Sequence, residues 1–363
     1  MTLTILNVPF PFVPLSDDPI GGAEQITAQL DRALVSKGHR SIVIAAEGSQ
    51  TAGQLSALPR VRGSIDNQAW HRVHDALRAS LARVLASEPV DLIHFHGCDF
   101  GAYLPPPGPP VLVTLHLPIG WYPREALQAQ RPLTWFNPVS QSQRQTAPQH
   151  LNLLPAIENG VAAEDFPSNV RKRGFALVLG RICPEKGFHH AISASVLAGV
   201  PLLIAGEVFP WIEHQRYFVE QIAPRLDNLR RWIGPIAGAR KRKLLAAARC
   251  VLVPSLAPET SSLVAMEALA AGTPVVAWRV GALPAIVDHG RTGYIIDDVA
   301  GMAEAIHRVD HIDPDACRSV ARQRFARTRM LESYLTLYQQ LITGAAAHAT
   351  RRETQSALAA RPC

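Results

Sequence analysis

The chain has 363 residues, a length that predicts two domains of ordinary size rather than one small core. Hydrophobic residues make up 47% of it and charged residues 18%, which excludes a chain that is disordered throughout. The formal net charge is +6, but arginines and lysines are scattered along the sequence, so we expect one or two anion-binding sites and no nucleic-acid partner.

No apolar run approaches the roughly 20 residues that a membrane-spanning helix needs, and the first residues turn polar too soon for a signal peptide. The five cysteines include no CxxC pair, and their odd number argues against a disulfide framework or a zinc ribbon. We therefore expect a soluble, cytoplasmic protein with reduced thiols. A peripheral contact with the inner face of a membrane stays open, although no clear amphipathic anchor is apparent.

Strands and helices alternate in the first half of the chain. A helix is predicted from about Ala23 to Lys37, where Gly38 is suited to end it. Short apolar runs predict buried parallel strands at residues 3–8, 41–46, 90–96, 111–116 and, more weakly, 134–139.

The same alternation restarts in the second half, after a linker-like stretch between residues 157 and 174. Strands are predicted at residues 175–179, 202–205, 231–233, 251–253 and 274–277. Helices are predicted to begin near residue 189 and to cover about 243–248, 263–271 and 320–342. Two successive series of this kind imply two doubly wound α/β domains, each with ligand groups at the carboxyl ends of its strands.

In the first predicted domain, Gly21 and Gly22 precede the first helix. Two glycines let a ligand approach the backbone, and a helix N-terminus favours an anion, although such a turn can equally be structural. His116 ends a strand, where a lone histidine is by default a core residue. His94 and His96 share one face of their strand, but no third ligand is in view, so we predict no metal site.

In the second predicted domain, two cations share a loop directly after a buried strand. Arg181 and Lys186 lie within the sequence GRICPEKG, and an arginine fork with a lysine point charge suits a diphosphate. The alternative is a solvated basic loop, but the position at the carboxyl end of a strand favours a functional role.

A serine-rich segment comes before the helix predicted at 263–271. Ser261 or Ser262 is predicted to start this helix, which leaves free N–H groups for phosphate oxygens. Glu267 has apolar neighbours in the sequence, so it needs hydrogen-bond donors, and ribose hydroxyls are suitable ones. Glu259 is also explained by a capping box on a wet helix face.

Together these residues resemble the retaining glycosyltransferases of family 4 (glycosyl transferases group 1), which have the GT-B architecture of two facing Rossmann-like domains. The resemblance covers nearly the whole chain, through GGAEQ, VDLIHFHG, VLVTLH, IENGV, GRICPEKG, IAGE and the stretch VLVPSLAPETSSLVAMEALAAGTPVVAWRVGALPAIVDHGRTGYIIDD. Thr260-Ser261-Ser262 depart from it, because the family usually has Gly-Phe-Gly there. The first loop and residues 46–51 resemble a bacterial branch active on natural-product or cell-envelope sugars.

The resemblance implies an α/β, GT-B fold with four segments. Residues 1–165 form an acceptor-side Rossmann-like domain, and residues 166–325 form the domain that binds the nucleotide-sugar. Residues 326–345 form a C-terminal crossover helix that packs back on the first domain, and residues 346–363 form a disordered tail.

The resemblance also implies roles for the candidate residues. Arg181 and Lys186 are expected to bind the donor diphosphate, Glu267 the ribose hydroxyls and Glu259 the hydroxyls of the donor sugar. The backbone of Ser262 and Leu263 is expected to contact the phosphates. In the first domain, Gly21 and Gly22 are expected to face the sugar–phosphate, and His116 to line the reaction centre. The residues expected to act in catalysis are His116, Arg181, Lys186 and Glu259.

The implied activity is retaining transfer of a hexose-type sugar from a nucleoside diphosphate, UDP by preference, to a hydroxyl of a glycan, lipid or natural product. No cofactor and no metal are expected, because Arg181, Lys186 and a helix N-terminus would stabilise the leaving diphosphate. Asp313-Pro314-Asp315 resembles the metal-binding DxD of other sugar transferases but is better explained as a helix cap. The alternatives are a nucleotide-sugar epimerase, a sugar phosphorylase and a non-catalytic nucleotide-sugar binder.

Overall fold

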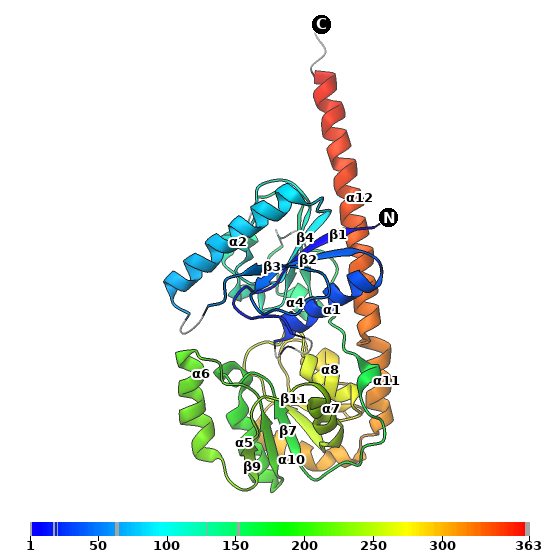
Figure 1. The fold of residues 1–363 in the computed structure, drawn as a ribbon. Coiled ribbons are helices and arrows are strands. Elements are labelled where there is room, and N and C mark those ends of the chain that lie inside the picture. The colour runs from blue at the N-terminus through cyan, green and yellow to red at the C-terminus, as the bar shows by residue number, and fades with distance from the viewer. Residues whose placement is uncertain are drawn as a thin grey trace.

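The computed structural model describes residues 2–359 apart from 17, 18, 20, 62–64, 129, 150 and 152, with side chains of the last helix as far as residue 347. Two lobes face each other, each built on a six-stranded parallel sheet (Figure 1). The strand orders are β3-β2-β1-β4-β5-β6 and β12-β11-β10-β7-β8-β9, so both sheets follow the same doubly wound order. The predicted pair of facing Rossmann-like domains is confirmed.

The first lobe holds the sheet formed by β1 to β6. Its strands are β1 (Thr4–Val8), β2 (Arg40–Ala46), β3 (Gln54–Leu58), β4 (Leu92–Phe95), β5 (Val111–Leu115) and β6 (Thr134–Pro138). Its helices are α1 (Gly22–Ser36), α2 (Asn67–Ser87), α3 (Arg124–Leu127) and α4 (Gln141–Gln145). The central strands β1, β4 and β5 are buried along their whole length, as their apolar sequences predicted.

The second lobe repeats this plan. Its strands are β7 (Ala176–Leu179), β8 (Leu202–Ala205), β9 (Arg230–Trp232), β10 (Cys250–Val253), β11 (Val275–Trp278) and β12 (Gly293–Ile296). Its helices are α5 (Phe188–Ala198), α6 (Ile212–Tyr217), α7 (Gly238–Ala247), α8 (Leu263–Ala270), α9 (Leu283–Ile286), α10 (Val299–Arg308) and α11 (Pro314–Arg324). The described cysteines are free thiols, as predicted, at Cys98, Cys183, Cys250 and Cys317, and Cys363 lies outside the described residues.

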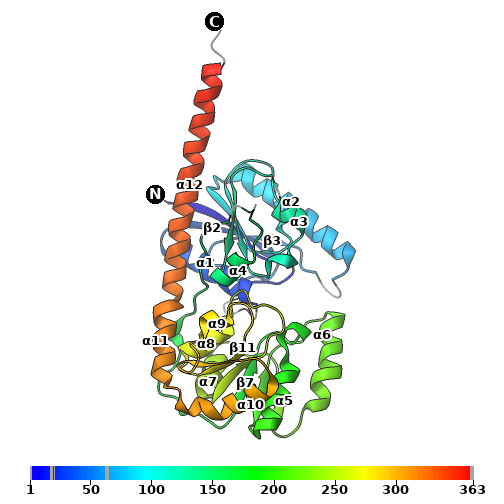
Figure 2. The same ribbon diagram turned by 180° about the vertical axis from the view of Figure 1, so that it is seen from behind.

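The chain crosses between the lobes twice, and the two crossings pair with each other. The Val161 amide donates to the Phe325 carbonyl at 2.8 Å, and the Arg327 amide donates to the Val161 carbonyl at 2.9 Å. Helix α12 (Arg327–Ala359) starts at this junction and runs along both lobes, as Figures 1 and 2 show from opposite sides. Its helical assignment continues past residue 345, where order was predicted to end, and the high helix propensity of the alanine-rich sequence accounts for this.

The prediction of a single helix over residues 320–342 is wrong. The structure divides it into α11 and α12, because the buried Phe325 at the break gives its carbonyl to the crossing strand instead of to a helix. Asp313 caps α11 by accepting from the Asp315 amide at 2.9 Å, which confirms the capping interpretation. Within the described residues, no helix combines the length and the apolar character needed to cross a membrane.

Candidate donor and acceptor site between the lobes

The loop after β7 carries the two predicted cations and is held in place by its glycines. Gly187 adopts the left-handed conformation with φ of 61°, and a Cβ there would collide with the carbonyl oxygen of Pro254. The Leu256 amide donates to the Glu185 carbonyl at 2.8 Å. These contacts hold the loop that follows β7 against the loop that follows β10, because both strands end at the same edge of the sheet.

This packing brings Lys186 to Glu259. The Lys186 Nζ lies 2.6 Å from the Glu259 Oε1, and the Ser255 hydroxyl donates to the same carboxylate oxygen. The Lys186 side chain is 32% exposed and that of Glu259 is 9% exposed, so a ligand can reach the cation. Gly281 fixes the Glu259 backbone: its φ is 53°, and a Cβ on it would collide with the Glu259 carbonyl.

Arg181 lies on an aromatic platform and near an acid of the opposite lobe. Its guanidinium carbon is 5.8 Å from the ring centroids of both Phe209 and Trp211. In the first lobe, Glu24 is 8% exposed, and burial raises the pKa of its carboxyl. The positive charge of Arg181 acts in the opposite direction on that pKa, which places Arg181 within electrostatic reach of Glu24.

Glu267 lies deeper in the second lobe and has a cation partner that the sequence did not predict. The Lys241 Nζ of α7 lies 3.0 Å from the Glu267 Oε1, and both side chains are 9% exposed. The expectation that Glu267 needs donors in an apolar helix is therefore met by a lysine in the structure. Lys241 was overlooked because Arg240 to Lys243 is a basic run, which is typical of a solvated helix face.

The first-lobe wall is lined by histidines from neighbouring strands. The His116 Nε2 lies 3.0 Å from the His96 Nδ1, and His94 is bonded through its two ring nitrogens to the hydroxyls of Tyr338 and Thr114, at 2.7 Å each. Burial lowers the pKa of His116 to about 4 and lowers those of His94 and His96 well below the usual value. Since both ring nitrogens of His94 are hydrogen-bonded, His94 cannot form a metal-binding pair with His96.

The lobes touch where the two walls meet. The Thr260 hydroxyl donates to the His116 carbonyl at 2.7 Å, and a Cβ on Gly22 would lie 3.4 Å from the Leu263 Cδ1. Ser262 caps α8 by accepting from the Ala265 amide at 3.4 Å, as predicted for the helix start. Thr260 stands where the family usually has glycine, so the departure from Gly-Phe-Gly creates a side-chain bond between the lobes.

The predicted site residues thus divide into three groups. Lys186 and Glu259 are in direct contact, and Arg181 shares the loop with Lys186. Glu267 lies further along α8, where it pairs with Lys241. The first-lobe residues reach the second lobe through Gly22 against Leu263 and His116 against Thr260, while Gly21 caps α1.

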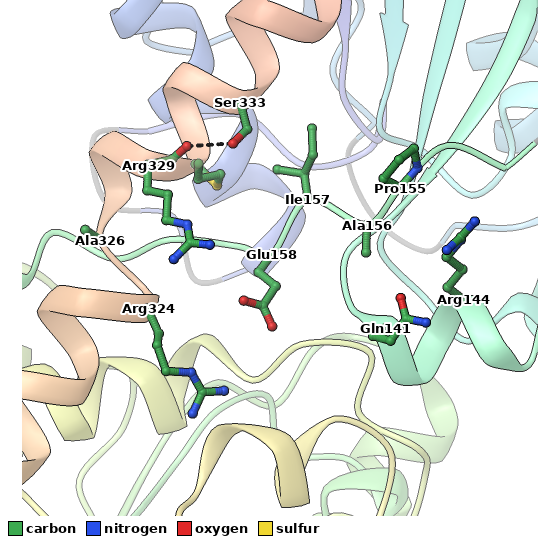
Figure 3. A pocket seen from close by; sticks show the side chains of 11 residues that line it. Gln141, Arg144, Pro155, Ala156, Ile157, Glu158, Arg324, Ala326, Arg329 and Ser333 are labelled. Atoms are coloured by element: carbon green, nitrogen blue, oxygen red, sulfur yellow. Dashed lines mark hydrogen bonds between the residues drawn. The ribbon is translucent and has the colours of Figure 1, made fainter.

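A separate cavity of about 290 Å³ lies where the chain crosses between the lobes, and none of the predicted site residues lines it. Its walls come from α4, the crossing at residues 155–158 and the junction of α11 with α12 (Figure 3). Arg144, Arg324 and Arg329 lie around it together with Glu158.

Comparisons with known proteins assign both lobes. Residues 20–150 match the family described as Glycosyltransferase Family 4, and residues 174–310 match the family described as Glycosyl transferases group 1. A glycogen synthase from Mycobacterium tuberculosis is 35% identical over 193 residues, which are 50% of this chain and 45% of that protein. A D-inositol 3-phosphate glycosyltransferase from Saccharomonospora viridis is 36% identical over 123 residues, 32% of this chain and 28% of that protein. The matched part therefore spans less than half the length of these curated relatives.

Solved structures resemble the whole chain. A glycosyltransferase involved in avilamycin A biosynthesis has a TM-score of 0.69 at 25% identity, covering 94% of this chain and 98% of its own. Sucrose-phosphate synthase from Thermosynechococcus elongatus has a TM-score of 0.78 at 20% identity, covering 94% of this chain and 100% of its own. The Anabaena protein HepE, solved with UDP and glucose, has a TM-score of 0.71 at 19% identity, covering 92% and 99%. These likenesses agree with the GT-B fold.

Proposed function

We propose that this chain, which belongs to the family 4, group 1 glycosyltransferases, transfers a hexose-type sugar from a nucleoside diphosphate to a hydroxyl acceptor with retention of anomeric configuration. The observation that carries the proposal is the cluster at the carboxyl ends of β7 and β10. There a reachable Lys186 lies 2.6 Å from Glu259, with Arg181 on the same loop. Fixed cations at this position suit a diphosphate, and the acid beside them suits sugar hydroxyls.

The donor would lie along the second-lobe wall. Arg181 and Lys186 would bind the diphosphate, and the amides at the start of α8 would add hydrogen bonds to its oxygens. Glu259 would accept from the hydroxyls of the sugar, while Glu267 would accept from the ribose. Both acids already have lysine partners, so the donor hydroxyls would share these carboxylates with the lysines.

Catalysis in this site is a matter of charge. When the bond between the anomeric carbon and the diphosphate oxygen breaks, the electron pair leaves with the nucleoside diphosphate and the sugar becomes oxocarbenium-like. Arg181 and Lys186 would stabilise the leaving group, so that no divalent metal is required on the diphosphate. The acceptor would attack from the same face, and the departing diphosphate would take its proton.

The first lobe would complete the site. His116 lies where the lobes meet, and its lowered pKa keeps the ring neutral near pH 7, so it can donate or accept a hydrogen bond without adding charge. Closure of the lobes would exclude water and suppress hydrolysis of the donor. We propose UDP as the nucleotide and a glycan, lipid or natural product as the acceptor.

The test is a thermal-shift screen of nucleoside diphosphates and their sugars in buffer without Mg²⁺ or Mn²⁺. A donor that binds the folded chain should raise its melting temperature, and UDP-hexoses should give the largest rise. The donor found in this way is then incubated with candidate acceptors, and the anomeric configuration of the product is read by NMR. Inversion, or strict dependence on added Mg²⁺, would refute the mechanism.

A further inference from the structure

Three potential metal ligands outside the donor-binding set converge beside Arg181. Cys183 lies in the loop after β7, Glu185 follows it in the same loop, and His214 lies on α6, at the outer part of the second lobe (Figure 1). Their ligand atoms all lie within 4.8 Å of one another. They come from two segments that are separate in the sequence, the loop after β7 and α6, so the fold itself brings His214 to the other two.

Two single atoms of this cluster are buried and have no hydrogen-bond partner among the described residues. They are the Glu185 Oε2 and the His214 Nδ1. The His214 side chain is 4% exposed, so water does not readily supply the missing bond. A buried polar atom without a hydrogen bond is destabilising, and two in one place call for an explanation.

We propose that Cys183, Glu185 and His214 bind one zinc ion. A thiolate, an imidazole and a carboxylate are the ligand types that Zn²⁺ prefers, while the thiolate selects against Mg²⁺ and Ca²⁺. In a tetrahedral zinc site the ligand atoms lie about 3.5 Å apart, so small side-chain movements from the present spacing would bring these three into place, and a water molecule would take the fourth position. The two anionic ligands balance the charge of the ion, which lets it lie near Arg181.

The surroundings hold these ligands in position. The His214 ring is stacked on Phe209 at 6.3 Å and tilted against Trp211 at 4.9 Å between centroids, and the Glu185 carbonyl accepts from the Leu256 amide. Burial lowers the pKa of His214, so its ring is neutral and can bind a metal. Burial also raises the pKa of the Cys183 thiol, so zinc would displace a proton from it.

Such an ion would tie the loop of Arg181 to the segment that holds its guanidinium. Cys183 and Glu185 lie shortly after Arg181 in the same loop, and His214 lies shortly after Phe209 and Trp211, whose rings contact the Arg181 guanidinium. Zinc is therefore expected to stabilise this corner of the second lobe. It is not placed on the donor diphosphate, so the proposed transfer chemistry is unchanged.

The experiment uses the full chain, stripped of metal with a chelator and titrated with Co²⁺. A cobalt–thiolate site should give one equivalent of a near-ultraviolet charge-transfer band together with visible bands of tetrahedral Co²⁺, and one equivalent of Zn²⁺ should abolish both. Zn²⁺ should also raise the melting temperature of the stripped chain. Absence of the charge-transfer band in the parent chain would overturn the proposal, whatever the chain does with a donor.

Variants assign the ligands. Cys183→Ser should lose the charge-transfer band, and His214→Gln should weaken Zn²⁺ binding at least about 100-fold, since even partners outside the ligand set are typically worth 10- to 100-fold. Cys98→Ser, in the first lobe, is the matched control and should keep both. Retention of the band in Cys183→Ser, or parental Zn²⁺ affinity in His214→Gln, would show that the ion lies elsewhere. Circular dichroism of each stripped variant checks that it folds, and if Cys183→Ser does not fold, the His214→Gln affinity decides.

Discussion

The facing walls of the two lobes differ in charge. The second-lobe wall carries fixed cations, and its acids are paired with lysines, Lys186 with Glu259 and Lys241 with Glu267. The first-lobe wall carries histidines whose pKa values are lowered by burial, so they are neutral at physiological pH. The contrast agrees with the proposal that the second-lobe wall binds an anion, while the first-lobe wall holds uncharged groups.

The two lysine–glutamate pairs differ within the second-lobe wall itself. Lys186 is 32% exposed and can exchange its partner for a ligand, whereas Lys241 and Glu267 are each 9% exposed and are held by the packing of α7 on α8. The same pair of residue types therefore serves an open site in one place and the interior in the other.

The largest effect is expected on stability at the buried pair. Glu267→Leu leaves the Lys241 charge buried without its acid and should lower the free energy of unfolding by about 3–5 kcal/mol, as measured by urea denaturation. The double variant Lys241→Met, Glu267→Leu should recover most of this loss, because apolar side chains can replace a buried pair. If the double variant binds the nucleoside diphosphate with parental affinity by calorimetry, the proposed ribose contact of Glu267 is wrong.

The open pair should affect turnover instead. Lys186→Ala should lower kcat/KM for donor turnover about 100- to 1,000-fold, or roughly 3–4 kcal/mol, because a cation on the leaving group is lost. Its unfolding free energy should fall by less than that of Glu267→Leu, since Lys186 is partly exposed and Glu259 keeps its hydrogen bond from Ser255. Lys243→Ala, an exposed lysine of α7, is the control. If Lys186→Ala turned over donor at the parental rate, the proposed contact of Lys186 with the diphosphate would be wrong.

The neutral histidines of the first-lobe wall should make the stability of the chain depend on pH in the acid range. The unfolded chain protonates His116 near pH 6.5, but the folded chain does so only near pH 4, so the unfolded state binds more protons between these values and stability falls as the pH drops. Between pH 6.5 and 5 this amounts to about 2 kcal/mol for one histidine. Between pH 6.5 and 5 the unfolding free energy of His116→Gln should therefore fall by about 2 kcal/mol less than that of the parent, as measured by urea unfolding. His71→Gln, on the exposed face of α2, should leave the pH dependence as in the parent.

The smallest effect is expected at the contact between the walls. Thr260→Val keeps the side-chain shape but removes the hydroxyl that donates to the His116 carbonyl, and should lower the unfolding free energy by about 1 kcal/mol. Thr328→Val, an exposed position of α12, is a control that should change it less. Equal losses in the two variants would mean that this bond contributes nothing between the lobes.

Much of the fold could be predicted because parallel strands in a doubly wound sheet are buried on both faces. The apolar runs that became β1, β4, β5, β7, β8 and β10 are therefore visible in the sequence. Strand β3 (Gln54–Leu58) was missed because it lies at the sheet edge, with a largely half-exposed and polar sequence. Strand β12 (Gly293–Ile296), at the other edge, begins with glycine, which is unfavourable in strands.

The site could be predicted only in part. The loop cations and the acids of α8 stand out because glycines and helix starts mark them. Lys241 and Thr260 do not stand out, because the role of each depends on a contact with a residue far away in the sequence. The separations are 26 positions for Lys241 and Glu267 and 144 positions for Thr260 and His116. The position of His214 beside Cys183 could not be predicted for the same reason, because the sequence alone does not show which distant segments pack together.

Helix α12 makes the first lobe a discontinuous unit. Tyr334 and Tyr338, near the end of the chain, are fully buried and bond to Asn137 and His94 of the first sheet, at 2.8 and 2.7 Å. A polypeptide cut after the second lobe would leave these polar groups uncovered, so the first lobe is not a portable module. Chimaeras that exchange donor-binding lobes between relatives should therefore transplant only the middle of the chain and keep α12 with the lobe at the opposite end of the gene.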